Sequence, residues 1–243
     1  MNLIILSEMS VYENLESICD KHGIKIKQVI AVDIVPIKYD VKKIKNFISK
    51  GVSIIFQSKN AIAHSIDIHE DINKYPDKEI YCIGKYSAKK INTMLGREAV
   101  FPLEDYSSES LFKLASDSLD KNDYVIIIKG EDGRKYLEKK LREMNCIVEV
   151  ISVYERIPKN LGTLKDSIRD DMNNYFIVSS KTALNNMLTH IQLIEGSAKN
   201  IIIVPNIRIV DGLNTKKISQ VLVVKNDASA EEYMRVIKKH NDE

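Results

Sequence analysis

The feature that most constrains this chain is an internal repeat, which emerges when the 243-residue sequence is compared with itself at an offset of 122 positions. At that offset hydrophobic runs and particular polar residues coincide. The aligned pairs are residues 3–6 with 125–128, Leu15-Glu16 with Leu137-Glu138, Pro36 with Pro158, Ser58-Lys59 with Ser180-Lys181, and Glu109 with Glu231. Chance similarity of two strand-helix units is the alternative. Because prolines and Ser-Lys pairs match at one offset, we interpret the repeat as a duplication.

Both copies alternate short apolar runs with segments of helical periodicity. The apolar runs, which are rich in Ile and Val and predict buried parallel strands, occupy residues 3–6, 54–56, 80–83, 125–128, 176–178, 201–204 and 221–224. Apolar residues recur at helical spacing between them, as in residues 183–191. The alternation predicts an α/β protein, and the chain length favours two doubly wound parallel-sheet domains.

A long extended segment in each copy predicts how these domains are connected. Residues 25–36 and 147–158 follow the first helix of their copy and end at proline, which cannot donate a hydrogen bond to a sheet. We therefore expect both segments to cross between the domains, side by side as a linker. The expected boundaries are 1–34 plus 158–243 for the first domain, 37–153 for the second, and crossings near 33–38 and 153–159.

Composition excludes several classes of protein. The chain is 44% hydrophobic and 29% charged with a formal net charge of +2, which fits a globular protein and gives no reason to expect a nucleic-acid partner. The first residues are apolar only briefly before Glu8, so we expect no signal peptide, no membrane span and a cytoplasmic location. The three cysteines form no Cys-x-x-Cys pair and fit buried thiols. The five histidines lack metal-ligand spacing, so we expect no metal.

Two strand-to-helix turns carry the strongest signal for a binding site. Residues 56–61 (Phe-Gln-Ser-Lys-Asn-Ala) and 178–183 (Val-Ser-Ser-Lys-Thr-Ala) each end a strand in hydroxyl and amide residues and then begin a helix. Such a turn offers unpaired backbone N–H groups, the positive end of a helix dipole and a lysine, all suited to a carboxylate or phosphate. Simple N-capping by Ser58 or Ser180 is the alternative. The occurrence of the same turn at equivalent positions favours ligand binding.

Two further turns follow strands and could line a similar site. Residues 129–134 (Lys-Gly-Glu-Asp-Gly-Arg) lack the glycine spacing of a dinucleotide loop and the Gly-Lys-Ser/Thr ending of a nucleotide loop, so they support nucleotide binding only weakly. Residues 83–88 place Gly84 and Ser87 after a strand. A flavodoxin-like protein is disfavoured because no hydroxyl-rich loop follows residues 3–6.

Tyr154 is a polar residue within an otherwise apolar stretch, at the second expected crossing, and its counterpart in the first copy is Val32. An aromatic residue in a strand most often serves packing. At a crossing between domains its hydroxyl could instead face a ligand and donate a proton or hydrogen bond. The sequence has no Gly-x-Ser-x-Gly elbow, so nucleophilic catalysis is unsupported.

Taken in order, these segments resemble the uroporphyrinogen-III synthase family over the whole chain. Residues 56–61 are similar to its Phe-Thr-Ser-x-Asn-Ala turn, 83–88 to Val-Gly-x-x-Thr-Ala, 106–111 (Tyr-Ser-Ser-Glu-Ser-Leu) to Ser-Glu-x-Leu, 129–134 to Arg-Gly-x-x-Gly-Arg, and 153–158 (Val-Tyr-Glu-Arg-Ile-Pro) to Val-Tyr-x-x-x-Pro. The order and spacing of these motifs are more specific than any one of them.

The resemblance implies two α/β domains joined by a two-stranded linker, with the active site in the cleft between them. It implies a cyclising hydro-lyase of tetrapyrrole and haem biosynthesis, which closes hydroxymethylbilane into uroporphyrinogen III with inversion of ring D and loss of water. In the family scheme the ring A hydroxyl departs to give an azafulvene, and ring D attacks to form a spiro intermediate. No metal or organic cofactor is implied, and a monomer that receives its substrate from hydroxymethylbilane synthase is expected.

The resemblance also assigns roles to residues of this sequence. Tyr154 matches the family tyrosine proposed to assist departure of the hydroxyl, so it is the candidate catalytic residue. The candidate substrate-binding residues lie in the turns, whose N–H groups and side chains would bind the substrate carboxylates. They are Ser58, Lys59, Asn60, Gly84, Ser87, Gly130, Arg134, Ser179, Ser180, Lys181, Thr182, Pro205, Asn206 and Arg208.

Two segments depart from the family pattern. Leu6-Ser7 stands where the family has Thr-Arg, and residues 204–208 (Val-Pro-Asn-Ile-Arg) stand where it has a second Gly-Pro-x-Thr turn. Ile207 therefore supplies no hydroxyl, and Asn206 and Arg208 would have to compensate. The alternative function is a non-catalytic two-domain module of the same fold that binds an anionic ligand.

Overall fold

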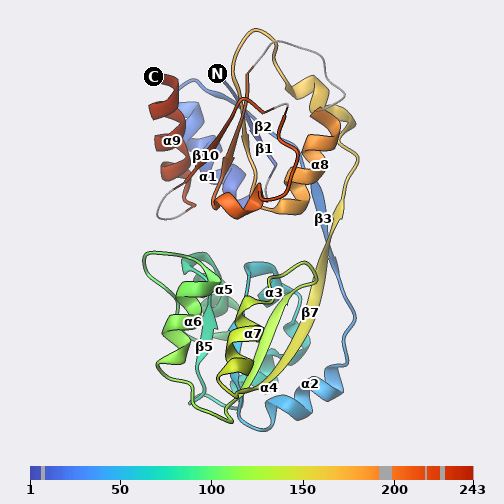
Figure 1. Cartoon of the computed structure of the whole chain (residues 1–243), viewed down its shortest axis with the longest axis vertical. Helices are drawn as coiled ribbons and strands as arrows, with labels where there is room; N and C mark the ends of the chain where they lie inside the picture. Colours follow the sequence, from blue (N-terminus) through green and yellow to red (C-terminus); the bar gives the residue numbers. More distant parts are fainter. Residues whose placement is uncertain (7–8, 192–198, 217, 225–227, 243) are drawn as a thin grey trace. The chain divides into compact units, whose positions relative to one another are not determined.

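The computed structural model describes residues 1–6, 9–191, 199–216, 218–224 and 228–242. The chain divides into two compact units, each built on a sheet flanked by helices (Figure 1). Unit 1 combines Met1–Asp33 with Ile157–Glu243, and unit 2 is Ile34–Arg156. Each unit therefore contains strands from both copies of the repeat.

Unit 1 is built on a five-stranded sheet in the order β10-β9-β8-β1-β2, in which neighbouring strands run parallel. The strands are β1 (Asn2–Ile5), β2 (Lys25–Gln28), β8 (Asn174–Ile177), β9 (Asn200–Val204) and β10 (Gln220–Val223). The helices are α1 (Met9–Lys21), η2 (Gly162–Ser167), α8 (Lys181–Ile191), η3 (Ile207–Ile209) and α9 (Ala230–Asp242).

Hydrophobic side chains on both faces of this sheet form two cores. Successive residues of a strand point to opposite faces, so Leu3 packs with α1 and α9 whereas Ile4 packs with α8 and η2. Tyr233 of α9 and Met187 of α8 are buried in these respective layers. Burial on both faces explains why the strands read as continuous apolar runs.

Unit 2 is built on a second five-stranded sheet in the order β3-β7-β6-β4-β5. The strands are β3 (Val32–Pro36), β4 (Ser53–Phe56), β5 (Ile80–Cys82), β6 (Tyr124–Gly130) and β7 (Ile147–Pro158). The helices are α2 (Val41–Ile48), α3 (Lys59–Ala63), η1 (Ile66–Ile68), α4 (His69–Asn73), α5 (Lys85–Leu95), α6 (Ser108–Ser116) and α7 (Tyr136–Glu143).

The two faces of the unit 2 sheet are again covered by different helices. Ile54 and Ile126 point to the layer that contains α2, α3, α4 and α5, whereas Ile55 and Ile127 point to α6 and α7. The pairs β4–β5, β4–β6 and β6–β7 are parallel. The predicted fold class, two α/β domains with doubly wound parallel sheets, is confirmed.

The strand orders of the two sheets correspond under the sequence repeat. The series β9-β8-β1-β2 in unit 1 matches β5-β4-β6-β7 in unit 2 when the copies are aligned. The correspondence extends to the edge, because Val221 of β10 pairs with Ile202 just as Val100 forms an isolated parallel bridge with Tyr81. Each sheet thus takes strands from both copies.

The long segments 25–36 and 147–158 differ in the structure. Residues 147–158 form the unbroken strand β7, and residues 25–36 are divided into β2 and β3. The first segment is not one continuous strand, because β2 pairs with β1 in unit 1 and β3 pairs with β7 in the other sheet. Pro36 and Pro158 end their strands as predicted.

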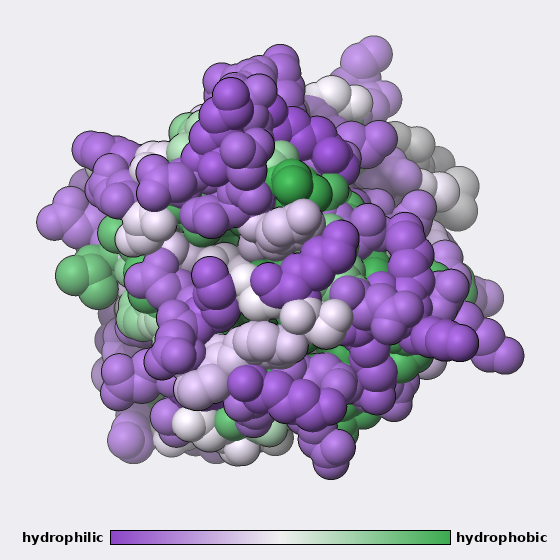
Figure 2. Space-filling model, turned by 90° about the horizontal axis from the view of Figure 1, so that it is seen from below, coloured by the Kyte–Doolittle hydropathy of each residue, from purple (hydrophilic) through white to green (hydrophobic). Residues whose placement is uncertain are grey.

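The face of the molecule drawn in Figure 2 is dominated by charged and polar side chains. On the face drawn in Figure 2, hydrophobic residues occur only in small separate groups. Among the described helices none is both long and apolar enough to cross a lipid bilayer.

Candidate functional site

The site in unit 2 lies where parallel strands end. Because β4, β5 and β6 are parallel neighbours, the turns that follow them share one edge of the sheet. These turns carry the predicted residues Ser58, Gly84, Gly130 and Arg134. Three of the turns singled out in the sequence, residues 56–61, 83–88 and 129–134, therefore lie at one edge of this sheet.

Ser58 follows β4 and caps the helix α3. Its backbone is extended, and its Oγ accepts a hydrogen bond from the N–H of Ala61 at 3.1 Å. Ser58 therefore acts as an N-cap, and ligand binding by this turn stays a prediction. Ser58 Oγ also lies 2.9 Å from the hydroxyl oxygen of Tyr154, so capping does not exhaust its contacts. Lys59 and Asn60, the next candidates, form the first turn of α3.

A β-bulge sets the direction of the Tyr154 side chain. Along β6 and β7, Lys129 pairs with Ser152 but Gly130 pairs with Tyr154, so one residue of β7 is left over. Such an insertion reverses the alternation of side chains beyond it. Val153 and Tyr154 consequently both pack in the layer that contains α3. Without the bulge, Tyr154 would point toward α6 and α7 instead.

Tyr154 is enclosed by polar and aromatic neighbours and is 2% exposed. Its ring lies 5.9 Å from the ring of His64, measured between centroids. Arg156 donates a hydrogen bond to the Tyr154 hydroxyl oxygen at 3.1 Å, and its guanidinium lies 5.1 Å from the Tyr154 ring centroid. Arg156 in turn forms a 2.6 Å ion pair with Asp132.

Arg156 and Asp132 were missed as site residues by sequence reasoning, although both lie in motifs that it singled out. The available signal was the spacing of two between Tyr154 and Arg156, since residues i and i+2 of a strand share a face. Asp132 gave no comparable signal, because its position opposite Arg156 depends on the path of the loop 130–134.

The loop 130–134 is shaped around the ammonium group of Lys129. This buried Nζ donates hydrogen bonds to the carbonyl oxygens of Gly130, Glu131 and Gly133 at 3.2, 3.3 and 3.0 Å. The ammonium has three protons, so these bonds use its full donor capacity. Lys129 therefore builds the loop and does not bind a phosphate, in agreement with the weak nucleotide signal.

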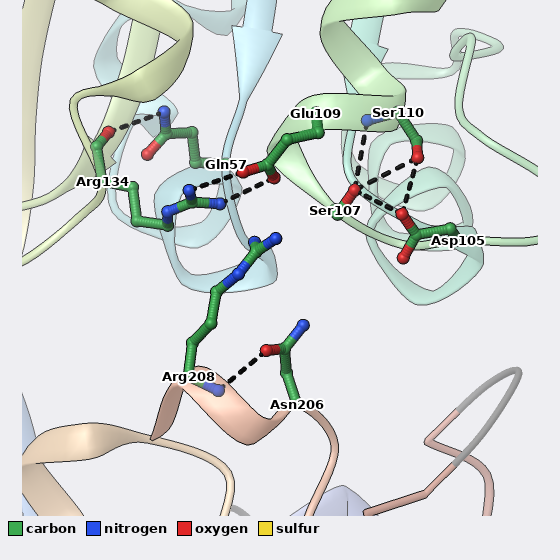
Figure 3. A network of polar contacts seen from close by, with 8 residues as sticks. All are labelled: Gln57, Asp105, Ser107, Glu109, Ser110, Arg134, Asn206 and Arg208. Atoms are coloured by element: carbon green, nitrogen blue, oxygen red, sulfur yellow. Dashed lines mark hydrogen bonds and ion pairs between the residues drawn. The ribbon is translucent and has the colours of Figure 1, made fainter. Parts of the chain in front are cut away.

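Arg134, a predicted binding residue, forms a two-pronged ion pair with Glu109. Its Nη1 and Nη2 lie 2.9 and 2.7 Å from the two carboxylate oxygens (Figure 3). The hydrogen bonds that Arg134 donates to the Glu109 carboxylate raise the pKa of Arg134 above its usual value. Gln57 Nε2 donates to the carbonyl oxygen of Arg134 at 3.2 Å, which ties the loop to the end of β4. An external carboxylate that binds Arg134 through the same two hydrogen bonds would have to displace Glu109.

The turn after β5 packs against the segment before α6. Gly84 precedes α5 and lies so close to Tyr106 that a Cβ there would be 3.1 Å from Cγ of that ring. Ser87, the other candidate, is in the first turn of α5, and its N–H donates to the carbonyl oxygen of Gly84. Ser107 caps α6 and donates from Oγ to Asp105 (Figure 3).

The corresponding turns of unit 1 hold the remaining candidates. Ser180 Oγ accepts from the N–H of Ala183 at 3.2 Å, which repeats the cap made by Ser58. Lys181 begins α8, and its Nζ donates to the carbonyl oxygen of Asp211 at 2.6 Å. Ser179 is exposed before it, and Thr182 follows in the helix. Val32 stands where unit 2 has Tyr154, so this cap has no matching phenol.

The altered turn after β9 keeps a compact form. Pro205 follows the strand, and the side chain of Asn206 accepts a hydrogen bond from the N–H of Arg208 at 3.0 Å, which begins η3 (Figure 3). Asn206 thus caps this short helix in place of the expected hydroxyl residue. The other departure includes Ser7, which lies outside the described residues.

The family assignment rests on a match that runs through both units. The family model described as uroporphyrinogen-III synthase HemD matches residues 13–223, which is most of the chain. The chain belongs to the uroporphyrinogen-III synthase family.

Known members of the uroporphyrinogen-III synthase family resemble this chain in sequence and in fold. A uroporphyrinogen-III synthase of Proteus mirabilis is 27% identical over 114 residues, which cover 46% of this chain and 57% of that protein. The match therefore spans little more than half the length of that relative.

Two solved structures show the same fold over the full length. The uroporphyrinogen-III synthetase of Helicobacter pylori has a TM-score of 0.62 at 14% identity, with 98% of this chain and 99% of that chain covered. A mutant uroporphyrinogen III synthase of Thermus thermophilus has a TM-score of 0.58 at 11% identity, with both chains fully covered.

The three cysteines of this family member lie in its hydrophobic cores. Cys19, Cys82 and Cys146 are all buried, as predicted. Burial raises the pKa of Cys19 to about 11 and that of Cys82 to about 12, so both thiols are protonated at neutral pH. Within the described residues, no three His, Cys, Asp or Glu side chains are grouped to hold a metal ion.

Proposed function

We propose that this chain is a uroporphyrinogen-III synthase that cyclises hydroxymethylbilane to uroporphyrinogen III, with inversion of ring D and loss of water. Membership of the family supports the proposal. The observation that carries it furthest is the 2.9 Å contact between Ser58 Oγ and the Tyr154 hydroxyl, at the edge of the sheet where strands end in binding turns. A phenol and a serine hydroxyl together offer a route for delivering a proton.

The chemistry needs acid assistance at one oxygen and control over how a flexible chain folds. The ring A hydroxyl must leave as water, and a proton from Tyr154 makes it a better leaving group. Ring D then attacks the azafulvene to form a spiro intermediate, which reopens and recloses with the ring inverted. Because unaided closure gives the uninverted isomer I, the enzyme must chiefly hold the substrate in the productive conformation.

We propose that the substrate carboxylates bind to the capped turns. Helix starts favour anions, and Ser58 and Ser180 each precede a lysine at such a start. In unit 2, Arg134 adds a guanidinium that can bind a carboxylate through two hydrogen bonds. In unit 1, Lys181 and Arg208 supply further positive charge. Their roles as substrate ligands rest on this chemistry and on the resemblance to the family.

The decisive experiment supplies hydroxymethylbilane to the purified chain from a coupled hydroxymethylbilane synthase. Chromatography of the oxidised products measures the ratio of isomer III to isomer I, and we expect isomer III in excess. Isomer I alone would show that the chain does not catalyse the inversion. If isomer I is the product and the substrate nevertheless binds, the chain is the non-catalytic module that was the alternative.

A second experiment tests the role of Tyr154 by substitution. Tyr154→Phe removes the hydroxyl and leaves the ring, so kcat should fall about a hundredfold, within the range for a lost general acid. Tyr124→Phe is the matched control. Tyr124 begins β6, whereas Gly130, which pairs with Tyr154, ends it, so the kcat of the Tyr124→Phe variant should equal that of the wild type. Thermal unfolding of each variant checks that the fold is retained. Unchanged turnover in Tyr154→Phe would remove Tyr154 from the mechanism.

A further inference from the structure

Arg156 is held in place by contacts on two sides. Its Nη1 forms the 2.6 Å ion pair with Asp132, and its Nη2 donates to the Tyr154 hydroxyl at 3.1 Å. Only 19% of its side-chain surface is exposed, and the guanidinium also lies over the Tyr154 ring. A long side chain with these restraints has a fixed orientation, in contrast to a surface arginine that samples many rotamers.

The hydrogen bond from Arg156 determines which way the Tyr154 hydroxyl points. A guanidinium has only donors, so the tyrosine oxygen must accept from it. Ser58 Oγ is the other neighbour of the tyrosine oxygen, at 2.9 Å, and donation to it would give the buried phenolic proton an acceptor. Ser58 Oγ already accepts from the N–H of Ala61, so two donors converge on it and its own proton points away from both.

The different burial of the two hydroxyl residues indicates which of them meets a ligand. Tyr154 is 2% exposed, whereas Ser58 is partly exposed at the end of β4. A ligand at the turn can therefore contact Ser58 directly and reach the phenol proton through it. In this arrangement each hydrogen bond is donated in the same direction, from Arg156 to Tyr154 and from Tyr154 to Ser58.

We infer that Arg156, oriented by Asp132, is a positioning residue that directs the Tyr154 proton to Ser58, which passes a proton to the substrate. The inference deepens the proposed function and rests on it. Ser58 is the group that touches the substrate, and Tyr154 is the source of the proton. Arg156 acts through Tyr154 and does not contact the reacting atoms.

The proton transfer balances without a further reactant. The C–O bond of the ring A hydroxymethyl group breaks, and its electron pair leaves with the oxygen, which takes the Ser58 proton and departs as water. Ser58 takes the Tyr154 proton in the same step. The phenolate that remains lies beside the guanidinium of Arg156, whose positive charge stabilises it. The azafulvene cation closes the ring, and the proton released on closure returns to the phenolate.

The test is a double-mutant cycle on kcat with the coupled assay described above. Arg156→Met should lower kcat at least tenfold with KM changed by less than about twofold, because the residue acts only on the proton. In a Tyr154→Phe background the same substitution should have no further effect. Arg156→Lys should restore part of the loss, since an ammonium can also donate to the phenol. Asp132→Asn should lower kcat less than Arg156→Met.

Controls distinguish this inference from its alternatives. Arg235→Met removes another arginine that is paired with a carboxylate, Glu232 on α9, and should leave kcat unchanged. An equal loss of kcat in both tyrosine backgrounds would overturn the inference, and a rise in KM alone would make Arg156 a substrate ligand instead. If the wild-type chain forms isomer III, the proposed function stands whichever result Arg156 gives. If it forms only isomer I, the proposed function and this inference both fail.

Discussion

Gly130 and Tyr154 are packed so closely that a Cβ at residue 130 would lie 2.5 Å from Cζ of the tyrosine ring. The two residues are paired across the bulge between β6 and β7, so neither backbone can move without disturbing the ladder. Gly130 does not have the positive φ that favours glycine. The Tyr154 ring, and not the backbone conformation, therefore leaves no room for a side chain at residue 130.

The first prediction is that Gly130→Ala displaces the Tyr154 ring and destabilises unit 2. Overpacking of this kind costs about 1–3 kcal/mol of unfolding free energy, which chemical denaturation of the whole chain can measure. Loss of the contact with Ser58 should lower kcat as well. Gly162→Ala is the matched control, because a Cβ there meets its nearest neighbour, Asn160, at an ordinary 3.5 Å. Equal stability of the two variants would contradict the packing argument.

The second prediction concerns Asn186, which joins α8 to two separate segments of unit 1. Its Nδ2 donates to the carbonyl oxygens of Ala31 at 2.8 Å and Lys159 at 2.7 Å, and the side chain is buried. Asn186→Ala leaves one buried and one partly buried carbonyl acceptor with fewer partners, so the unfolding free energy should fall by about 1–3 kcal/mol. Asn185→Ala makes the same change at the exposed neighbouring residue and should shift it by less than about 0.5 kcal/mol.

Much of the architecture could be predicted from the sequence because it depends on periodic patterns. Apolar runs gave the strands, and the repeat gave the equivalence of Ser58 and Ser180. The location of the turns then followed, because the carboxyl ends of parallel strands meet at one edge of a sheet. These features are local or are repeated, so a single chain shows them without any knowledge of long-range contacts.

The parts that could not be predicted depend on contacts between distant segments. The bulge that turns Tyr154 toward Ser58 is a property of the register between β6 and β7, which no residue pattern records. The break between β2 and β3 likewise arises because the segment changes its partner strand. The pairing of Arg134 with Glu109 joins a loop to a helix 25 residues earlier in the chain. The bulge, the strand break and the ion pair could therefore be identified only from the three-dimensional structure.

The third prediction concerns the pH dependence contributed by His69. This side chain is buried, with its Nε2 3.2 Å from Ser65 Oγ and its ring against Phe56. Burial lowers the pKa of His69, and the Ile62 backbone and the charge of Asp67 oppose that effect less strongly. In the unfolded chain the imidazole titrates near its usual value of about 6.5. Between the two pKa values the unfolded chain binds more protons, so acidification through this window favours unfolding.

Replacement of His69 separates its contribution to the pH dependence of the unfolding free energy from the contribution of the carboxylates. The unfolding free energy of the wild type should fall more steeply below pH about 6.5 than that of His69→Gln, when both are measured by denaturant titration at several pH values. Parallel curves for wild type and His69→Gln would show that the buried imidazole does not contribute.

The fourth prediction is that removal of one hydroxyl stabilises the chain. Among the described residues, the buried hydroxyl of Tyr39 has no hydrogen-bond partner. Burial, together with the charge of Asp67, raises the pKa of Tyr39 to about 12, so the group stays protonated at neutral pH and still lacks an acceptor. Tyr39→Phe removes the unpaired group and should raise the unfolding free energy by about 1 kcal/mol, since an unsatisfied buried donor costs about that much or more.

The control for Tyr39 is a tyrosine of the same unit whose hydroxyl is satisfied. Tyr75 donates to the carbonyl oxygen of Ser49 at 2.9 Å, so Tyr75→Phe should be neutral or destabilising. The gain from Tyr39→Phe should also grow above pH about 10, where the unfolded chain loses the phenolic proton before the folded chain does and the wild type is therefore destabilised. Denaturant titrations at pH 7 and pH 10.5 measure both effects. A loss of stability in Tyr39→Phe at pH 7 would mean that the hydroxyl is hydrogen-bonded in solution, since only a lost bond explains that sign.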